Sequence, residues 1–166
     1  MKELLSRTLF FIKLQKITSV ILAVCVLLIV VTQVLLRYVF KAPLMGIEEA
    51  LIFPTIWLYM FGGANASQER NHIECGILTL YIKKPLSIIK FNVIRSTLSV
   101  IVGGWLLYWA YWLLTYSLKA LKTSDLLYIP MIIMESAPFI GLLLMLLYAV
   151  YDLRNIVQLY LIERRK

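Results

Sequence analysis

Four long apolar stretches, separated by short polar ones, set the pattern of this chain. A helix that spans a membrane needs about 20 mostly apolar residues. The pattern predicts four such spans, at residues 17–36, 47–66, 91–116 and 131–151. The first stretch, ITSVILAVCVLLIVVTQVLL, has no charged residue and no small-residue cleavage site behind it, so we interpret it as a retained anchor. The spans take up most of the chain, which predicts one all-α membrane domain over residues 1–166.

Two of the polar stretches mix apolar and basic residues. The N-terminal segment sets LL and LFFI among charged residues, and the sequence YIKKPLSIIK between the second and third spans is similar. Such a mixture is typical of short helices that lie in the membrane interface. We therefore expect either an interfacial helix in each segment or a loosely ordered basic segment.

The lysines and arginines are distributed unevenly between the two ends of the spans. Thirteen of the 17 fall in the N-terminal segment, in the loop between spans two and three, and in the C-terminal tail. The other four are Arg37, Lys41, Lys119 and Lys122. Because basic loops stay on the cytoplasmic side, both termini are predicted to be cytoplasmic. The polar segment QERNHIE, at residues 68–74, then marks the cytoplasmic exit of span two.

Composition agrees with a membrane environment. Hydrophobic residues make up 61% of the chain, charged residues 16%, and the mean hydropathy is +0.85. A soluble domain is nearer half apolar and a quarter charged. The net charge of +8 comes without a basic stripe of interleaved stacking aromatics, which excludes nucleic acid as a partner. It indicates contact with anionic lipid headgroups instead.

Three acidic residues lie near the predicted outer ends of spans. Glu48 and Glu49 open the second span, and Glu135 lies one turn into the fourth. One interpretation is a proton or ion site built from these acids. The other is stabilisation of helix starts, where negative charge is favourable. We favour the second, because no acid lies at the midplane, where a coupling site is expected.

Ionisable groups within spans are costly and need partners. The sequence suggests two ion pairs. Arg37 is close in sequence to Glu48 and Glu49, and Arg95 and Asp152 both lie towards the cytoplasmic side.

The sequence does not indicate an enzyme, a metal site or a cofactor. His72 is the single histidine, so a haem site with two histidine ligands is impossible. Cys25 is predicted at mid-membrane and Cys75 in the cytoplasm, which excludes a zinc site that joins both to His72. A loop hydrogen bond or a headgroup contact is the expected role of His72. The glycine pairs 62–63 and 103–104 are expected to let helices approach closely.

Three stretches are distinctive in their order and spacing. QVLLRYVFKAPLMGIEEALIF, at 33–53, joins an arginine-aromatic helix end to an acidic pair through a short proline-containing loop. FGGANASQERNHIECGIL, at 61–78, runs from a glycine- and alanine-rich helix end into a charged stretch with a histidine. TSDLLYIPMIIMESAPFIGLLLMLL, at 123–147, has an Ile-Pro entrance and a Pro-x-x-Gly pattern. Together they resemble the small membrane subunit of tripartite ATP-independent periplasmic (TRAP) transporters, the DctQ family. Glu135 departs from the more uniformly apolar helix of that family.

The resemblance covers nearly the whole chain and implies a system of three proteins. A soluble periplasmic receptor captures an organic carboxylate, and a large membrane subunit moves it inward using a sodium gradient. The small subunit is similar to a scaffold that braces the large subunit and helps to form the face where the receptor docks. The resemblance thus implies a non-catalytic subunit in a bacterial inner membrane, with the large subunit, the receptor and lipids as partners. The chain looks nearest to members that serve sialic acid.

The residues themselves agree with an accessory role. We see no broken helix pair and no midplane polar group, so we expect no substrate or sodium site within this chain. The outer loops, 37–47 and 117–130, are short and are expected to form only part of a receptor platform. Charged residues there, such as Lys41 and Asp125, would tune the rate of encounter more than the affinity.

Two other functions stay open at this stage. One is an autonomous small transporter, coupled to protons or ions through Glu48, Glu49 or Glu135. The other is a membrane anchor of a respiratory complex that holds quinone or haem.

Overall fold

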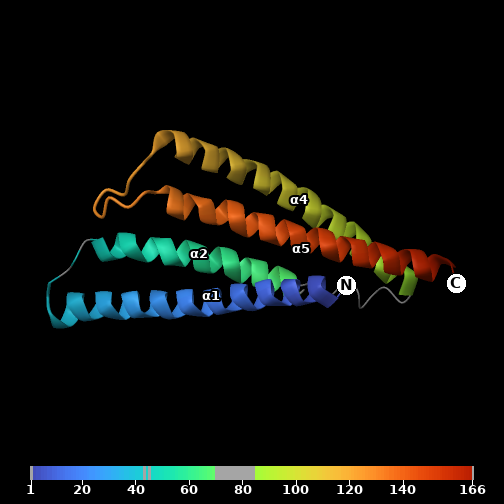
Figure 1. The fold of residues 1–166 in the computed structure, drawn as a ribbon, viewed down its shortest axis with the longest axis horizontal. Helices are drawn as coiled ribbons and strands as arrows, with labels where there is room; N and C mark the ends of the chain where they lie inside the picture. Colours follow the sequence, from blue (N-terminus) through green and yellow to red (C-terminus); the bar gives the residue numbers. More distant parts are fainter. Residues whose placement is uncertain (1, 43, 45, 70–84, 166) are drawn as a thin grey trace.

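The computed structural model describes residues 2–42, 44, 46–69 and 85–165, and its helices are long (Figure 1). They are α1 (Lys2–Val34), the π-helix η1 (Leu35–Val39), α2 (Gly46–Glu69), α4 (Pro85–Ala120) and α5 (Ile132–Arg165).

Long helices occur where the apolar stretches predicted them, which confirms the all-α fold. Three segments are long and apolar enough to cross a membrane: Phe11–Val39, Ser87–Ala120 and Ile132–Ile162. The α2 helix is not among them, since its apolar stretch also contains Pro54, two glycines and the acidic pair at its start.

The helices lie side by side in the order α1, α2, α5, α4 (Figure 1). The chain thus forms two antiparallel helical hairpins, α1–α2 and α4–α5, which meet where α2 runs parallel to α5. Both termini lie at one end of this array, and the α1–α2 and α4–α5 connections lie at the other. The predicted placement of both termini on one side is consistent with this arrangement.

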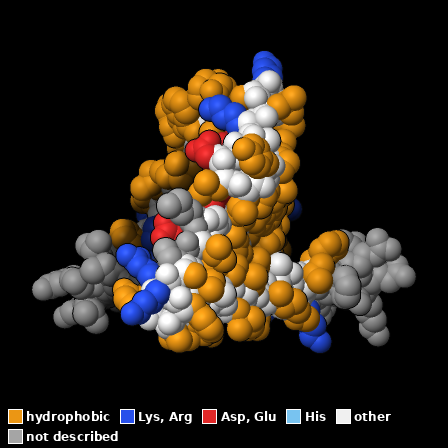
Figure 2. Space-filling view, turned by 90° about the vertical axis from the view of Figure 1, so that its left-hand side faces the viewer, with side chains coloured by type: hydrophobic (Ala, Val, Ile, Leu, Met, Phe, Trp, Pro, Cys, Tyr) orange, Lys and Arg blue, Asp and Glu red, His pale blue; other side chains and the backbone are white. Residues whose placement is uncertain are grey.

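The array is open rather than closed around a core. Its accessible surface is 12639 Å², whereas about 8,400 Å² is expected for a folded soluble protein of 19.2 kDa. In the described part of the chain, the buried apolar side chains are three alanines: Ala64, Ala110 and Ala137. Large apolar side chains therefore cover the outside of the array, and Figure 2 shows them dominating the end that faces the viewer.

Small residues bring α2 and α5 together. A Cβ atom added at Gly141 on α5 would lie 2.6 Å from Cβ and 3.2 Å from Cα of Met60 on α2. Gly63 faces Met145 in the same contact, and Gly103 on α4 faces Leu146 at 3.3 Å. By contrast, an added Cβ at Gly62 or Gly104 would meet open space. The prediction of close approach is therefore correct for one glycine of each predicted pair.

The expectation of a separate interfacial helix at the N-terminus is wrong. Residues 2–34 form one continuous helix of 33 residues, about 50 Å long at 1.5 Å per residue. This stretch contains no glycine or proline, so nothing in it ends the helix before the bilayer begins. The other expected interfacial segment, YIKKPLSIIK, covers residues 81–90, of which 81–84 lie outside the described residues. Residues 85–90 extend α4, with Pro85 in the first helical position.

Candidate functional site

The α4–α5 loop, residues 121–131, folds back on itself at the end of the array opposite the termini. The Ser124 N–H donates to the Ile129 carbonyl, and the Met131 N–H donates to the Lys122 carbonyl, both at 2.9 Å. Thr123 and Pro130 form an isolated antiparallel bridge between the two arms. The loop therefore has a defined backbone conformation despite its short length.

Glu49, in the first turn of α2, binds the tip of this loop. Its carboxylate accepts the backbone N–H groups of Asp125 at 2.9 Å, Leu126 at 3.1 Å and Leu127 at 2.9 Å. Hydrogen bonds to an ionised acceptor are stronger than neutral ones. Three consecutive amides on one carboxylate thus attach the α4–α5 loop to α2.

Ser124 lies directly before the three amides in the loop. The Ser124 side chain is buried, but its hydroxyl falls short of hydrogen-bond geometry. The amides are therefore the main attachment. A hollow of about 450 Å³ adjoins the carboxylate and is lined by Glu49 and loop residues that include Met131.

The predicted pairing of Arg37 with Glu48 or Glu49 is wrong. Glu48 instead accepts a hydrogen bond from the Gln33 amide at 3.1 Å, and the Glu49 carboxylate accepts hydrogen bonds from the loop amides. The Arg37 guanidinium lies 5.9 Å from the centre of the Tyr38 ring. The first turn of α2 directs its two acids to α1 and to the α4–α5 loop, away from the end of η1.

Other predicted residues are dispersed. Lys41 and Asp125 are exposed in the two connections. Glu135 is half-buried in the first turn of α5, and its Oε2 is buried without a hydrogen-bond partner among the described residues. Arg95 on α4 and Asp152 on α5 are half-buried on neighbouring helices, and their pairing stays a prediction.

His72 lies outside the described residues, so its expected role stays a prediction. In the described part of the chain, no three His, Cys, Asp or Glu side chains are placed to hold a metal ion. The three acids of the proposed ion site lie at the starts of two helices, where two of them already accept hydrogen bonds.

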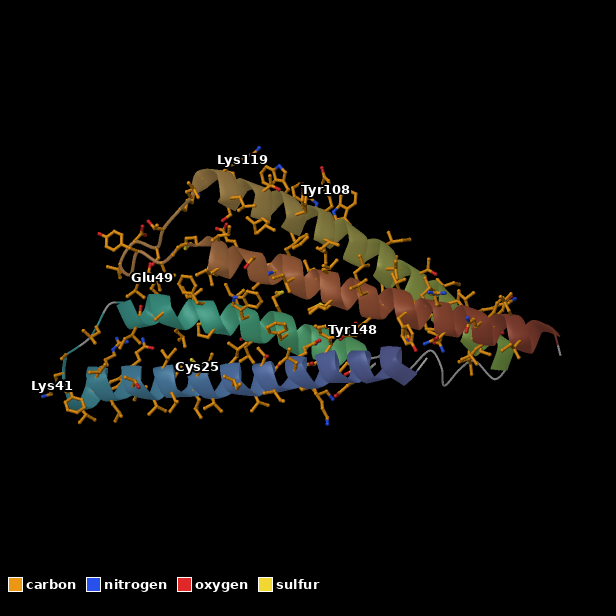
Figure 3. All side chains as sticks on the ribbon, in the orientation of Figure 1. Cys25, Lys41, Glu49, Tyr108, Lys119 and Tyr148 are labelled. Carbon is orange, nitrogen blue, oxygen red and sulfur yellow. The ribbon has the colours of Figure 1, made fainter. Side chains whose placement is uncertain are left out.

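Neutral polar side chains near the terminal end link three helices, and the sequence pattern did not predict these links. Tyr148 on α5 donates its hydroxyl to the Gln15 side chain on α1 at 3.0 Å (Figure 3). Asn65 on α2 donates to the Ser19 hydroxyl on α1 at 2.8 Å. The four-residue spacing of Gln15 and Ser19 on one helix face was the available signal.

Two further links join α2 to its neighbours. Lys16 on α1 forms an ion pair with Glu69 at the end of α2. At the middle of α2, the Trp57 indole N–H donates to the Ile133 carbonyl in the first turn of α5 at 2.9 Å. Polar links of this kind stabilise helix contacts in lipid by about 0.6 kcal/mol each on average. The arrangement is suited to holding helices together.

The Trp57 link gives a testable prediction. Trp57→Phe should remove the hydrogen bond to α5 while it keeps most of the ring, and should lower the thermal midpoint in detergent by roughly 2 °C. Trp105→Phe is the matched control, since Trp105 is 68% exposed on α4. Scanning fluorimetry of both variants measures the difference. Equal thermal midpoints for the two variants would show that the Trp57 hydrogen bond does not contribute to stability.

Comparison with known proteins adds one finding. Residues 26–159 match the family model described as "Tripartite ATP-independent periplasmic transporters, DctQ component". No curated protein matches the chain.

Proposed function

The chain belongs to the DctQ family and is the small membrane component of a TRAP transporter, and on that premise we propose that it acts as a brace for the transporter's large subunit. The transporter would be a sodium-coupled importer of an organic carboxylate in a bacterial inner membrane. Sialic acid is the first carboxylate to test.

The open array is the observation that supports this role most strongly. The two edge helices pack mainly on one neighbour each, α1 on α2 and α4 on α5, and Tyr148 of α5 also reaches Gln15 on α1. Their remaining surface is apolar and exposed, as the 12639 Å² of total accessible surface reflects. In lipid such a surface gains little from the hydrophobic effect, and association depends on close packing and a few polar links. A long flank of this kind suits a static contact with a larger membrane protein.

We propose that α2 is the fourth crossing. It has 24 residues, about 36 Å of helix, and it lies between α1 and α5, which are apolar enough to span. A helix placed between two spanning helices shares their surroundings. Glu48 and Glu49 then lie at its outer mouth, with both termini in the cytoplasm and the α4–α5 loop in the periplasm, where the soluble receptor docks.

Reconstitution tests the brace directly. Liposomes would contain this chain alone, the large subunit alone, or both, with the receptor and labelled sialic acid outside and an inward sodium gradient. Uptake is expected only when both membrane subunits are present. Sodium-driven uptake by the chain alone would show that it is a transporter in its own right.

Glu135 distinguishes the brace from an autonomous transporter coupled through its acids. Glu135→Gln in the two-subunit complex should reduce the initial uptake rate by no more than about twofold. The reason is that the charge of a half-buried carboxyl at a helix start adds little stability beyond that of the amide which replaces it. Glu48→Gln is the matched control in the neighbouring acid position. Complete loss of sodium dependence in Glu135→Gln would identify a coupling residue and contradict the accessory role.

A further inference from the structure

Backbone strain gathers at the end of the array that holds the two connections. In the described part of the chain, the non-glycine residues with positive φ are Lys41 at 51°, Leu121 at 45° and Tyr128 at 52°. Lys41 lies in the α1–α2 connection, and the other two lie in the α4–α5 loop. Such conformations are unfavourable for residues with a Cβ atom and persist only where the surroundings impose them. Their concentration at one end calls for a local cause.

The Glu49 carboxylate supplies that cause for the α4–α5 loop. Its bonds to the amides of Asp125, Leu126 and Leu127 end one residue before the strained Tyr128. The cross-loop bond from the Ser124 N–H to the Ile129 carbonyl closes the loop around the same tip. The carboxylate thus fixes a backbone conformation that the loop sequence, which lacks glycine, does not favour.

The fixed loop displays apolar side chains beside cations. Tyr128 is 76% exposed and Leu126 is 53% exposed. Lys41 and Lys119 are exposed at the same end of the array (Figure 3), and the Lys122 ammonium lies 4.8 Å from the centre of the Tyr116 ring. Glu49 and Glu48 are engaged by donors within the chain. Asp125, at the loop tip, is exposed, but the cations Lys41, Lys119 and Lys122 outnumber it at this end.

We infer that Glu49 is the positioning residue of a docking loop, which presents Tyr128 and Leu126, beside lysines, to a protein partner with an acidic contact surface. This rests on the proposed function, in which the loop faces the periplasm and the partner is the transporter's soluble receptor. A fixed loop binds a rigid partner more tightly than a flexible loop does, because no conformational entropy is lost in ordering it at binding. A fluid headgroup layer adapts to any loop shape, so a fixed loop gains no affinity for it. Strain and attachment together therefore favour a protein partner over lipid.

Three pairs of variants test this inference in the complex of the two membrane subunits in nanodiscs. Each pairs a loop change with a control: Glu49→Gln with Glu48→Gln, Tyr128→Ala with Tyr108→Ala, and Lys41→Glu with Lys13→Glu. Tyr108 is 65% exposed on α4, within a predicted span, and Lys13 is exposed near the terminal end. Receptor binding would be measured by interferometry, and loop order by amide hydrogen exchange.

Glu49→Gln should speed exchange of the amides of residues 125–127 by about tenfold and weaken receptor binding by about tenfold. Tyr128→Ala should weaken binding by about tenfold with exchange at Asp125 and Leu126 unchanged. Lys41→Glu should slow association several-fold at low salt and less at high salt. The control variants should stay within about twofold of the wild type.

Different contrary results would overturn the docking loop and the proposed bracing function. Unchanged receptor binding in Glu49→Gln or Tyr128→Ala complexes that still co-purify overturns the docking loop alone. A second outcome also overturns the docking loop. If Tyr128→Ala loses affinity for anionic phosphatidylglycerol vesicles while its receptor binding is unchanged, the loop is a lipid contact. If the wild-type chain does not form a complex with the large subunit, the proposed function fails and the docking loop fails with it.

Discussion

Uptake by the transporter is expected to fall to background when this chain is removed and the large subunit is kept. In the described part of the chain, extensive apolar surface is exposed and few side chains are buried, and this surface is the one that the proposed bracing contact would use. A large subunit that loses this flank exposes its own matching surface to lipid and loses the support that keeps its static part in place. The effect should therefore be a loss of transport rather than a modest change in affinity.

The measurement is uptake of labelled substrate in a strain that lacks this chain. Immunodetection of the large subunit in the membrane fraction separates loss of activity from loss of protein. Re-expression of the chain should restore uptake, and so should re-expression of the Gly104→Ala variant, in which the added methyl group meets open space. Unchanged uptake without the chain would contradict a required bracing role.

Gly141→Ala is expected to have the largest effect of any single methyl group added to this chain. The new Cβ atom would lie 2.6 Å from Met60 Cβ and 3.2 Å from Met60 Cα. These atoms belong to or adjoin the backbone of α2 and do not swing away as the end of a long side chain does. Overpacking of this kind costs about 1–3 kcal/mol. It acts where the α1–α2 hairpin meets the α4–α5 hairpin, so the two hairpins should separate.

Thermal unfolding in detergent measures this effect, with a midpoint expected to fall by roughly 5 °C. Gly104→Ala, on α4, is the matched control. It adds the same methyl group to open space and replaces glycine in a helix, which is favourable by up to about 1 kcal/mol. The two variants should therefore shift the midpoint in opposite directions. A shift of the same sign and size in both would show that the α2–α5 contact is not as close as the structure describes.

The sequence predicted the helices better than it predicted their ends. Apolar runs locate the part of a helix that lies in lipid, so the fourth span was placed at 131–151. The helix continues to Arg165, because charged helix formers such as Arg154 extend it beyond the apolar region. In the same way, α4 begins at Pro85, before the predicted 91. Hydropathy alone does not report where a helix ends.

The order of the helices and the partners of Glu49 were not predictable from one sequence. Local spacing suggested that Glu49 would bind Arg37, which is 12 positions away. Its actual partners, the amides of Asp125 to Leu127, are 76 to 78 positions away in the chain. They reach it only because α5 packs beside α2. Backbone donors have no sequence signature, so only the fold reveals this contact.

The bracing role rests on a stable complex between this chain and the large subunit, and one measurement tests it most directly. Both membrane subunits would be expressed together, purified in mild detergent through a tag on this chain, and analysed by native mass spectrometry. The account predicts a complex that contains both subunits. Recovery of this chain alone, with the large subunit present in the same membranes, would contradict it.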